Sequence, residues 1–401
     1  MTSGSIVAQI TDYANRADPY PLYAELRKTP VRREDDGTYV VSTYYEVRSL
    51  ANDPRLSNDT SNRPAGHERP GQPAEGGLPP SFIFTDPPVH DRLRDTINRP
   101  FGPPHSPRFL DGLRGELAKV VTELLDAFEG KDQVDIVEDF AYPLPVTAIC
   151  KVLGVPREDE PLFHSWADAL ASSVDPGSGD DGGAEKAQRA RQELGAYLAD
   201  LIETKRRHPG PGILSALAPD MTPADLEATA VLLLVAGHET TVNAITNTTL
   251  TLLRHPDILE RFQKDPELAV PIVEEVLRYE PPVQFVPWTT ALADIDIADT
   301  TIPKGSPVWL MVAAANRDPR RFEDPDRFDP DRKDNEHLGF YTGIHYCFGA
   351  PLARMELHLA VPELFRRVKF SRLLEDPPPY RANAVLRGPR HLPVAIEGLA
   401  D

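Results

Sequence analysis

Residues 340–349 hold the side chains best suited to chemistry in this chain. They read Phe340-Tyr-Thr-Gly343-Ile-His345-Tyr-Cys347-Phe-Gly349 and directly precede a helix that the sequence predicts from residue 350. Glycine lets a bulky flat group approach the backbone, and a helix N-terminus favours a thiolate over a thiol. These residue types leave two alternatives open. Cys347 could be inert packing, or it could join His345 in a zinc site, although no further Cys or His follows at ligand spacing.

Three other groups of polar residues have spacings that could be functional. Ala236-Gly237-His238-Glu239-Thr240-Thr241 lies inside a long apolar segment, where an acid and a hydroxyl are costly to bury. A helix kink with a threonine bonded back to a carbonyl would also explain that segment. His90 and Arg94 are four residues apart, and Glu275 and Arg278 three apart, so each pair shares one helix face. Exposed surface pairs are the alternative in both cases.

The elements that must position these residues are mostly helical. Apolar spacing of the helical kind dominates residues 88–280, and residues 223–253 form the longest and most apolar stretch. Strand and turn character follows residue 281. We expect a mainly α protein with a minor β part (α+β), folded as a single domain over residues 1–401. The expected smaller elements are a helix at 21–28, a strand at 39–41 after the turn 35–37, a loop at 61–80, a break at 175–183, a helix at 350–368 and a β element at 385–396.

Composition excludes several classes of protein. The chain has 401 residues, a net charge of −19 and only two cysteines, Cys150 and Cys347. An acidic surface disfavours nucleic acid, and two cysteines cannot staple a secreted module. We expect Cys150 to be core packing. The apolar run at 228–236 is far shorter than the ~20 residues that span a bilayer, so we expect a cytoplasmic protein without a membrane segment.

The ten residues around Cys347 resemble the haem-binding loop FxxGxHxCxG of the cytochrome P-450 family at every specified position. The resemblance implies haem b as cofactor, with Cys347 as the axial thiolate and metal ligand and His345 at a haem propionate. Phe340, Gly343 and Gly349 would complete the loop against the haem. The implied fold is that of the cytochromes P-450, with the haem between the long central helix and the helix after the cysteine loop.

The other motifs follow in the order that this family shows. Ala236 and Gly237 would open the central helix over the haem, Thr240 would hydrogen-bond oxygen and Glu239 would relay protons. These last two are the implied catalytic residues. Glu275 and Arg278 match the family's ExxR pair. The resemblance implies that Arg327, from Pro325-Asp-Arg-Phe328, joins them in a structural network.

The haem carboxylates are the point at which this sequence departs from the family. His90 and Arg94 match the HxxxR motif, whose side chains bind one propionate. Trp288 stands where an arginine usually reaches the other propionate, and tryptophan donates one N–H but carries no charge. Our hypothesis from the sequence is that His90, Arg94 and His345 together hold the haem, with Trp288 contacting it.

The resemblance implies a monooxygenase that hydroxylates or epoxidises a bulky lipophilic molecule such as a macrolide or another polyketide. It would use O2 and electrons from a ferredoxin and its reductase, which Arg354 could help to dock. The predicted substrate contacts are Phe84, Leu170, Val174, Leu232, Val235, Val283, Phe285, Val286, Val385 and Leu386. Glu68, Glu75, Asp175, Asp180 and Asp181 suggest either a solvated acidic rim or a preference for a cationic substrate.

Two rival functions are compatible with a haem site. The first is oxidative phenol coupling or a peroxide-driven oxidation, and an intact pair of Glu239 and Thr240 disfavours an enzyme that uses peroxide alone. The second is a haem-dependent binding module without catalysis. Such a module would be expected to have lost Glu239, Thr240 or the ExxR pair, and this sequence keeps all of them.

Overall fold

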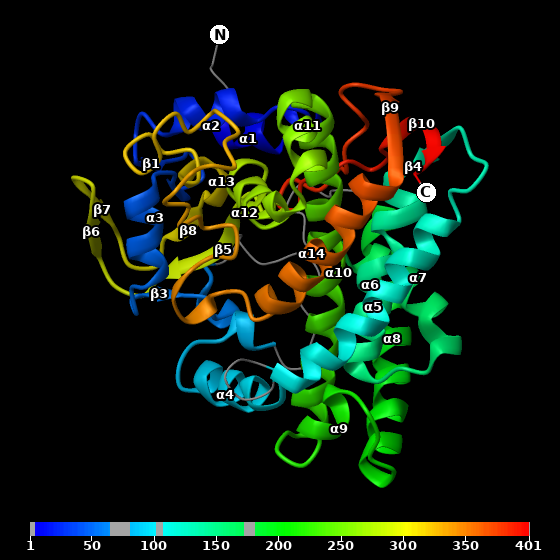
Figure 1. Cartoon of the computed structure of the whole chain (residues 1–401). Helices are drawn as coiled ribbons and strands as arrows, with labels where there is room; N and C mark the ends of the chain where they lie inside the picture. Colours follow the sequence, from blue (N-terminus) through cyan, green and yellow to red (C-terminus); the bar gives the residue numbers. More distant parts are fainter. Residues whose placement is uncertain (1–4, 65–80, 102–106, 172–180, 401) are drawn as a thin grey trace.

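A computed structural model of the chain describes residues 5–64, 81–101, 107–171 and 181–400. The helix α10 (Pro223–Arg254) runs through the middle of the molecule, and α14 (Ala350–Arg367) packs across it (Figure 1). The other helices are α1 (Ile6–Thr11), α2 (Tyr20–Leu26), α3 (Tyr44–Ala51), α4 (Val89–Phe101), α5 (Pro107–Asp126), α6 (Pro143–Leu153), α7 (Glu160–Ala171), α8 (Asp181–Arg207), α9 (Ile213–Leu217), α11 (Pro256–Lys264), α12 (Ala269–Tyr279) and α13 (Val312–Ala315).

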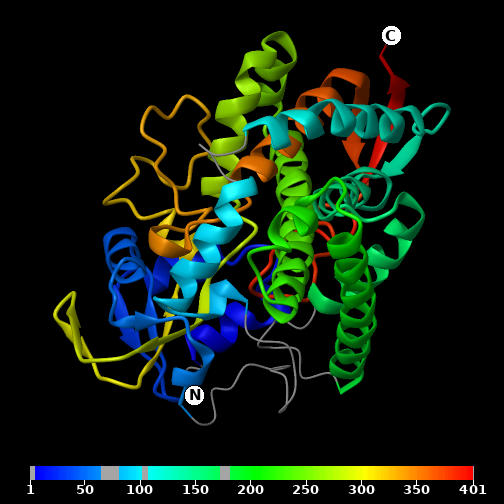
Figure 2. The same ribbon diagram turned by 90° about the horizontal axis from the view of Figure 1, so that it is seen from below.

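The strands form three small sheets. The largest has the order β1-β2-β8-β5-β3, the second has the order β4-β10-β9, and β6 and β7 form a hairpin. The strands are β1 (Val31–Arg33), β2 (Tyr39–Val41), β3 (Leu56–Ser57), β4 (Gln133–Asp135), β5 (Val286–Ala291), β6 (Ile295–Ile297), β7 (Thr300–Ile302), β8 (Pro307–Leu310), β9 (Val368–Leu373) and β10 (Pro393–Leu399). Figures 1 and 2 show the five-stranded sheet on one side of α10 and α5 to α8 on the other.

The sequence of α10 explains both its length and its central place. The Thr222 side chain caps the helix by accepting a hydrogen bond from the N–H of Asp225, and Pro223 occupies its first turn. This helix is long and apolar enough to cross a membrane, but 72% of its most apolar window is buried inside the protein. It is therefore the core helix of the fold, and the main hydrophobic cluster forms around it and α5, α6, α8 and α14.

Most predicted elements are confirmed, including the long central helix, the hairpin of β1 and β2, and the mainly α class with small sheets. Three details differ. Strand β4 interrupts the region predicted as helical, and the last helix ends at Arg367, so that Val368 already begins β9. The final strand is β10, later than the predicted 385–396; before it, Leu386 makes only an isolated bridge to Val283. Short strands in this protein pair with distant segments, so local periodicity does not reveal them.

Candidate active site: a cysteine loop facing the central helix

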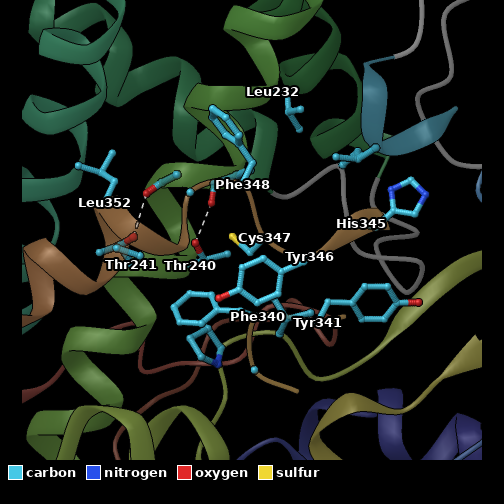
Figure 3. Close-up of a pocket in the computed structure, with 18 of the residues that line it drawn as sticks. Leu232, Thr240, Thr241, Phe340, Tyr341, His345, Tyr346, Cys347, Phe348 and Leu352 are labelled. Atoms are coloured by element: carbon cyan, nitrogen blue, oxygen red, sulfur yellow. Dashed lines mark hydrogen bonds between the residues drawn. The ribbon is translucent and has the colours of Figure 1, made fainter. Parts of the chain in front are cut away.

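Cys347 lies in the loop between the short helix Gly343–His345 and α14. Its backbone N–H donates to the carbonyl of Phe340 at 2.8 Å, which closes the loop. The side chain lines a cavity of about 270 Å³ whose opposite wall is α10. Figure 3 shows the sulfur of Cys347 and the hydroxyl of Thr240 in this pocket. The structure thus brings together two residues that are more than 100 positions apart in the sequence.

The surroundings of the Cys347 sulfur act on its pKa in opposite directions. Burial raises the pKa of the thiol, which is the larger effect, while the backbone N–H groups of Gly349 and Ala350 and the charge of Arg94 lower it. The N–H groups belong to the beginning of α14, so the helix N-terminus supports a thiolate as the sequence suggested. A metal ion on the sulfur would stabilise the thiolate further.

Two glycines of the loop have different physical roles. Gly343 has a φ of +70°, and a Cβ there would lie 2.6 Å from the carbonyl oxygen of Ala51, so the fold itself requires glycine. It is not among the cavity-lining residues. Gly349 lines the cavity, and a Cβ there would meet only the Cys347 sulfur, at 4.0 Å. The protein alone does not require a glycine at 349, whereas a flat group packed on this loop would.

Arg94 and His345 line the cavity, and His90 lies directly behind His345. The rings of His90 and His345 have centroids 4.6 Å apart, and Arg94 donates to the carbonyl of Tyr346 at 2.8 Å. Nε2 of His90 and Nδ1 of His345 are buried without a hydrogen-bond partner. Burial, with His90 and Arg94 nearby, lowers the pKa of His345 to about 3. Unpartnered buried ring nitrogens beside the Arg94 cation fit a polar, anionic group, as the carboxylate of a haem would be.

The α10 motif places its two polar residues on different sides of the helix. Thr240 lines the cavity and donates to the carbonyl of Ala236 at 2.7 Å, and Ala236 and Gly237 line the cavity as well. The helix is continuous there, so the predicted opening is not seen as a break. Glu239 is buried away from the cavity lining, where its Oε1 lies 2.8 Å from Nε of Arg381. No sequence motif indicated Arg381, because it comes from the irregular C-terminal segment.

The ExxR pair is fully buried. Nε and Nη2 of Arg278 donate to the carboxylate of Glu275, each at 2.8 Å, and Nη1 donates to the carbonyl of Asn316 at 2.9 Å. The side-chain oxygen of Asn316 accepts the N–H of Leu338 at 2.7 Å, just before the cysteine loop. The pair therefore braces this loop through Asn316. The three-residue spacing on α12 places both side chains on one helix face, which allows them to pair.

The predicted role of Arg327 in this network is wrong for its side chain. Arg327 is 68% exposed and contributes only its backbone carbonyl, which accepts from Arg278 at 3.1 Å. The side chain of Arg332 has the role that was predicted for Arg327. It is 10% exposed, and its Nε lies 3.4 Å from Oε2 of Glu275. Both arginines follow a Pro-Asp pair in the sequence DPDRFDPDR, so the motif alone did not say which one turns inward.

Only some predicted substrate contacts reach the cavity. Leu232, Val283 and Val286 line it, as does Trp288, whose ring packs against that of Phe84 at 5.6 Å. Leu170, Val235, Phe285, Val385, Leu386 and Phe84 itself are not among the lining residues. Phe285 stacks on Trp309 at 5.1 Å, and Val385 and Leu386 lie in the same core cluster, so their apolar character serves packing. Leu170 likewise belongs to the main core.

Some predicted residues lie outside the described part of the chain, and some residues of the cavity wall were not predicted from the sequence. Val174, Glu68, Glu75, Asp175 and Asp180 lie outside the described residues, and Asp181 begins α8. The lining residues that the sequence did not predict include Ile83, Ile149, Thr241, Ala244, Leu352 and Glu356. Of these, Glu356 is buried, and burial raises its pKa well above the usual range. Apolar residues on helices carry no signal that separates a cavity wall from the core.

Comparison with known proteins agrees with this site. Residues 184–394 match the family model "Cytochrome P450". The chain is 39% identical to cytochrome P450 monooxygenase PikC of Streptomyces venezuelae, over 94% of this chain and 91% of that protein. It is 36% identical to 6-deoxyerythronolide B hydroxylase of Saccharopolyspora erythraea, over 95% and 96% of the two chains. The ligand-free crystal structure of Mycobacterium smegmatis CYP164A2 superposes with a TM-score of 0.88 at 37% identity, covering 97% and 99%.

The fold and the cysteine-loop cavity thus define a haem-thiolate protein. The chain belongs to the cytochrome P450 family, and it is a monooxygenase of that family with haem b as its cofactor. The residues present fit the haem on two observations, the unpartnered buried nitrogens of His90 and His345 and the open face of Gly349. When bound, the haem supplies the redox chemistry that activates dioxygen.

Proposed function

We propose that this monooxygenase hydroxylates or epoxidises a bulky lipophilic small molecule, a secondary metabolite of the macrolide or polyketide kind. The observation that carries the proposal is the cavity shared by Cys347 and Thr240, whose remaining wall is mostly apolar through residues such as Leu232, Val283 and Val286. An apolar wall with few polar groups favours a lipophilic ligand. The relative named 6-deoxyerythronolide B hydroxylase supports the substrate class.

In this proposal each polar residue has a distinct task. Cys347 would hold the haem iron as a thiolate, and His90, Arg94 and His345 would bind a haem carboxylate. Thr240 presents its hydroxyl to the cavity and can leave the carbonyl of Ala236 to hydrogen-bond the reacting oxygen. Glu239, one residue away but outside the cavity lining, supplies protons to that hydroxyl from the Arg381 side of α10. The proton would therefore enter from the side of α10 that contacts Arg381, and not through the apolar substrate space.

Electrons would come from a ferredoxin and its reductase, and the enzyme would act in the cytoplasm. The proposed docking residue Arg354 is already engaged: its Nε and Nη2 donate to Glu274 at 2.6 and 2.8 Å, and its Nη1 donates to the hydroxyl of Tyr346 at 3.1 Å. Its guanidinium also lies over the ring of Phe340 at 4.4 Å. These contacts support a role in bracing the cysteine loop, and a ferredoxin would meet Arg354 only as part of that cluster.

The thiolate assignment is tested by the spectrum of the reduced carbon monoxide complex. The wild-type protein should show the red-shifted Soret band of thiolate-ligated haem, and Cys347→Ala should lose it. Cys150→Ala is the matched control, because Cys150 is fully buried in the core and should leave the band in place. A normal band in Cys347→Ala would overturn the assignment.

The substrate class is tested by titrating neutral and amine-bearing macrolides and following the haem spin state. A lipophilic cavity should bind members of both sets, and product analysis should then find one added oxygen atom. If amine-bearing compounds bind at least tenfold tighter, and neutralising Glu68 and Glu75 removes that preference, the acidic residues select the substrate. Binding of neither set would contradict the proposed class and leave the thiolate test unaffected.

A further inference from the structure

Arg94 supplies a cation at one end of the cavity, but Trp288 leaves the other carboxylate of a haem without the arginine that the family usually supplies. Trp288 lines the cavity from β5 and carries no charge. An ionised carboxylate buried beside it would be costly without a cation or several donors. A cation from elsewhere in the fold would therefore have to supply that charge.

Arg63 is the cation that the fold places against Trp288. Its Nη2 donates to the backbone carbonyl of Trp288 at 3.2 Å. The segment that carries Arg63 follows β3, which pairs with β5, so the chain runs along the strand that holds Trp288. Neighbouring Asn58, five residues earlier, lines the cavity together with Trp288. Arg63 is not itself among the lining residues, but it comes from a different part of the sequence to the backbone of Trp288, one residue away from the cavity wall.

The Arg63 side chain is also incompletely paired. It is half-buried, and its Nε is buried without a hydrogen-bond partner. Burial lowers the pKa of Arg63. Among residues 5–64, 81–101, 107–171 and 181–400, no carboxylate forms an ion pair with it. A guanidinium that has a free N–H donor and no carboxylate partner among the described residues is suited to bind a carboxylate through two parallel hydrogen bonds.

We propose that Arg63 replaces the missing arginine and holds the haem carboxylate on the Trp288 side, with Trp288 positioning it through the backbone carbonyl. The inference rests on the haem site and not on the proposed substrate, so it can fail while the monooxygenase assignment stands. It also replaces the simpler hypothesis that His90, Arg94 and His345 suffice.

The test measures how fast the ferric holoenzyme transfers its haem to excess apomyoglobin. Arg63→Gln, which keeps a donor for the Trp288 carbonyl but loses the charge, should lose haem about tenfold faster, a loss of about 1.4 kcal/mol. Arg63→Lys should release haem at a rate between those of wild type and Arg63→Gln, because lysine keeps the charge but not the two-point geometry. Arg55→Gln is the control, because Arg55 is an exposed neighbour paired with Asp53. The ferric/ferrous reduction potential should become more negative in Arg63→Gln alone, since a cation near the haem is lost.

The double variant Arg63→Gln with Trp288→Arg gives a second test. It restores the arginine on β5 and should recover slow haem release. Wild-type haem release in Arg63→Gln would overturn the proposal, as would equally fast release in Arg63→Lys. Fast release with an unchanged potential would show that Arg63 only shapes the loop, which would also overturn it. Circular dichroism of each apoprotein separates these outcomes from misfolding.

Discussion

Nε of Arg381 lies 2.8 Å from Oε1 of Glu239, and this ion pair joins the C-terminal segment to the centre of α10. Both side chains are largely buried, at 10% and 3% exposed. Asn243, one turn later on α10, donates to the same carboxylate oxygen at 3.4 Å. The acid proposed to deliver protons is therefore held outside the cavity lining, by a residue that no family motif identified.

Removing Glu239 alone should lower the free energy of unfolding more than replacing both Glu239 and Arg381. Glu239→Gln leaves the Arg381 charge buried and should lower the free energy of unfolding by about 3–5 kcal/mol, since an unpaired buried charge is strongly unfavourable. Glu239→Gln with Arg381→Met should recover most of that loss. Denaturant unfolding of the three proteins measures the difference.

The same variants distinguish a structural role of Glu239 from a role in proton delivery. If Glu239 delivers protons, the double variant should be stable but should still form product at least tenfold more slowly, with the consumed electrons appearing as hydrogen peroxide. The ratio of product to peroxide is the measurement. Full activity in the stable double variant would show that Glu239 serves only as the partner of Arg381.

Substituting Arg332 and Arg327 in turn tests which arginine belongs to the network around Glu275. Arg332→Met should destabilise the protein by about 1–3 kcal/mol and lower its haem content, because it removes a buried cation from Glu275. Arg327→Met should change stability by less than about 0.5 kcal/mol, since that side chain is exposed. Thermal unfolding and the haem-to-protein ratio measure both effects. Equal losses in the two variants would contradict the assignment.

Gly343 and Gly349 should respond differently to substitution by alanine. Gly343→Ala should destabilise even the apoprotein by about 1–3 kcal/mol, because its φ of +70° and the nearby Ala51 carbonyl oppose a Cβ. Gly349→Ala should leave apoprotein stability unchanged but weaken haem binding, because a Cβ there would enter the space of the cofactor. Unfolding of the apoproteins and a haem titration distinguish the two. Unchanged haem affinity in Gly349→Ala would argue against close packing at this face.

The contact between Glu274 and Arg354 should make stability depend on acid pH. Burial raises the pKa of Glu274, but hydrogen bonds from Arg354 and His337 outweigh burial and bring the pKa to about 2. Because the folded pKa lies below that of the unfolded chain, this stabilisation is complete above about pH 4.5 and is lost as the pH falls towards 2.

Substitution of Glu274 tests whether this stabilisation is lost as the pH falls. Glu274→Gln should be less stable than wild type by up to about 3 kcal/mol at neutral pH, and this difference should shrink as the pH falls from about 4.5 towards 2. Glu363→Gln is a control, since Glu363 pairs with Arg366 on the surface of α14. Urea unfolding at several pH values provides the comparison, and a gap that stays constant with pH would contradict it.

The sequence by itself determined the class of the protein and the residues of its cysteine loop. The spacing from Phe340 to Gly349 needs no partner elsewhere in the chain to be recognised, and the apolar run of α10 predicts a buried helix for the same local reason. His90 and Arg94, and Glu275 with Arg278, are also close in sequence, so helix geometry alone places each pair on one face.

The tertiary structure alone decided the contacts between distant segments. It turned Arg332 and not Arg327 towards Glu275, and it paired Glu239 with Arg381 across the fold. It also separated Val283 in the cavity wall from Phe285 in the core, two apolar residues that look alike in the sequence. Such choices depend on which surfaces meet after folding, and that information is distributed over the whole chain and absent from any one motif.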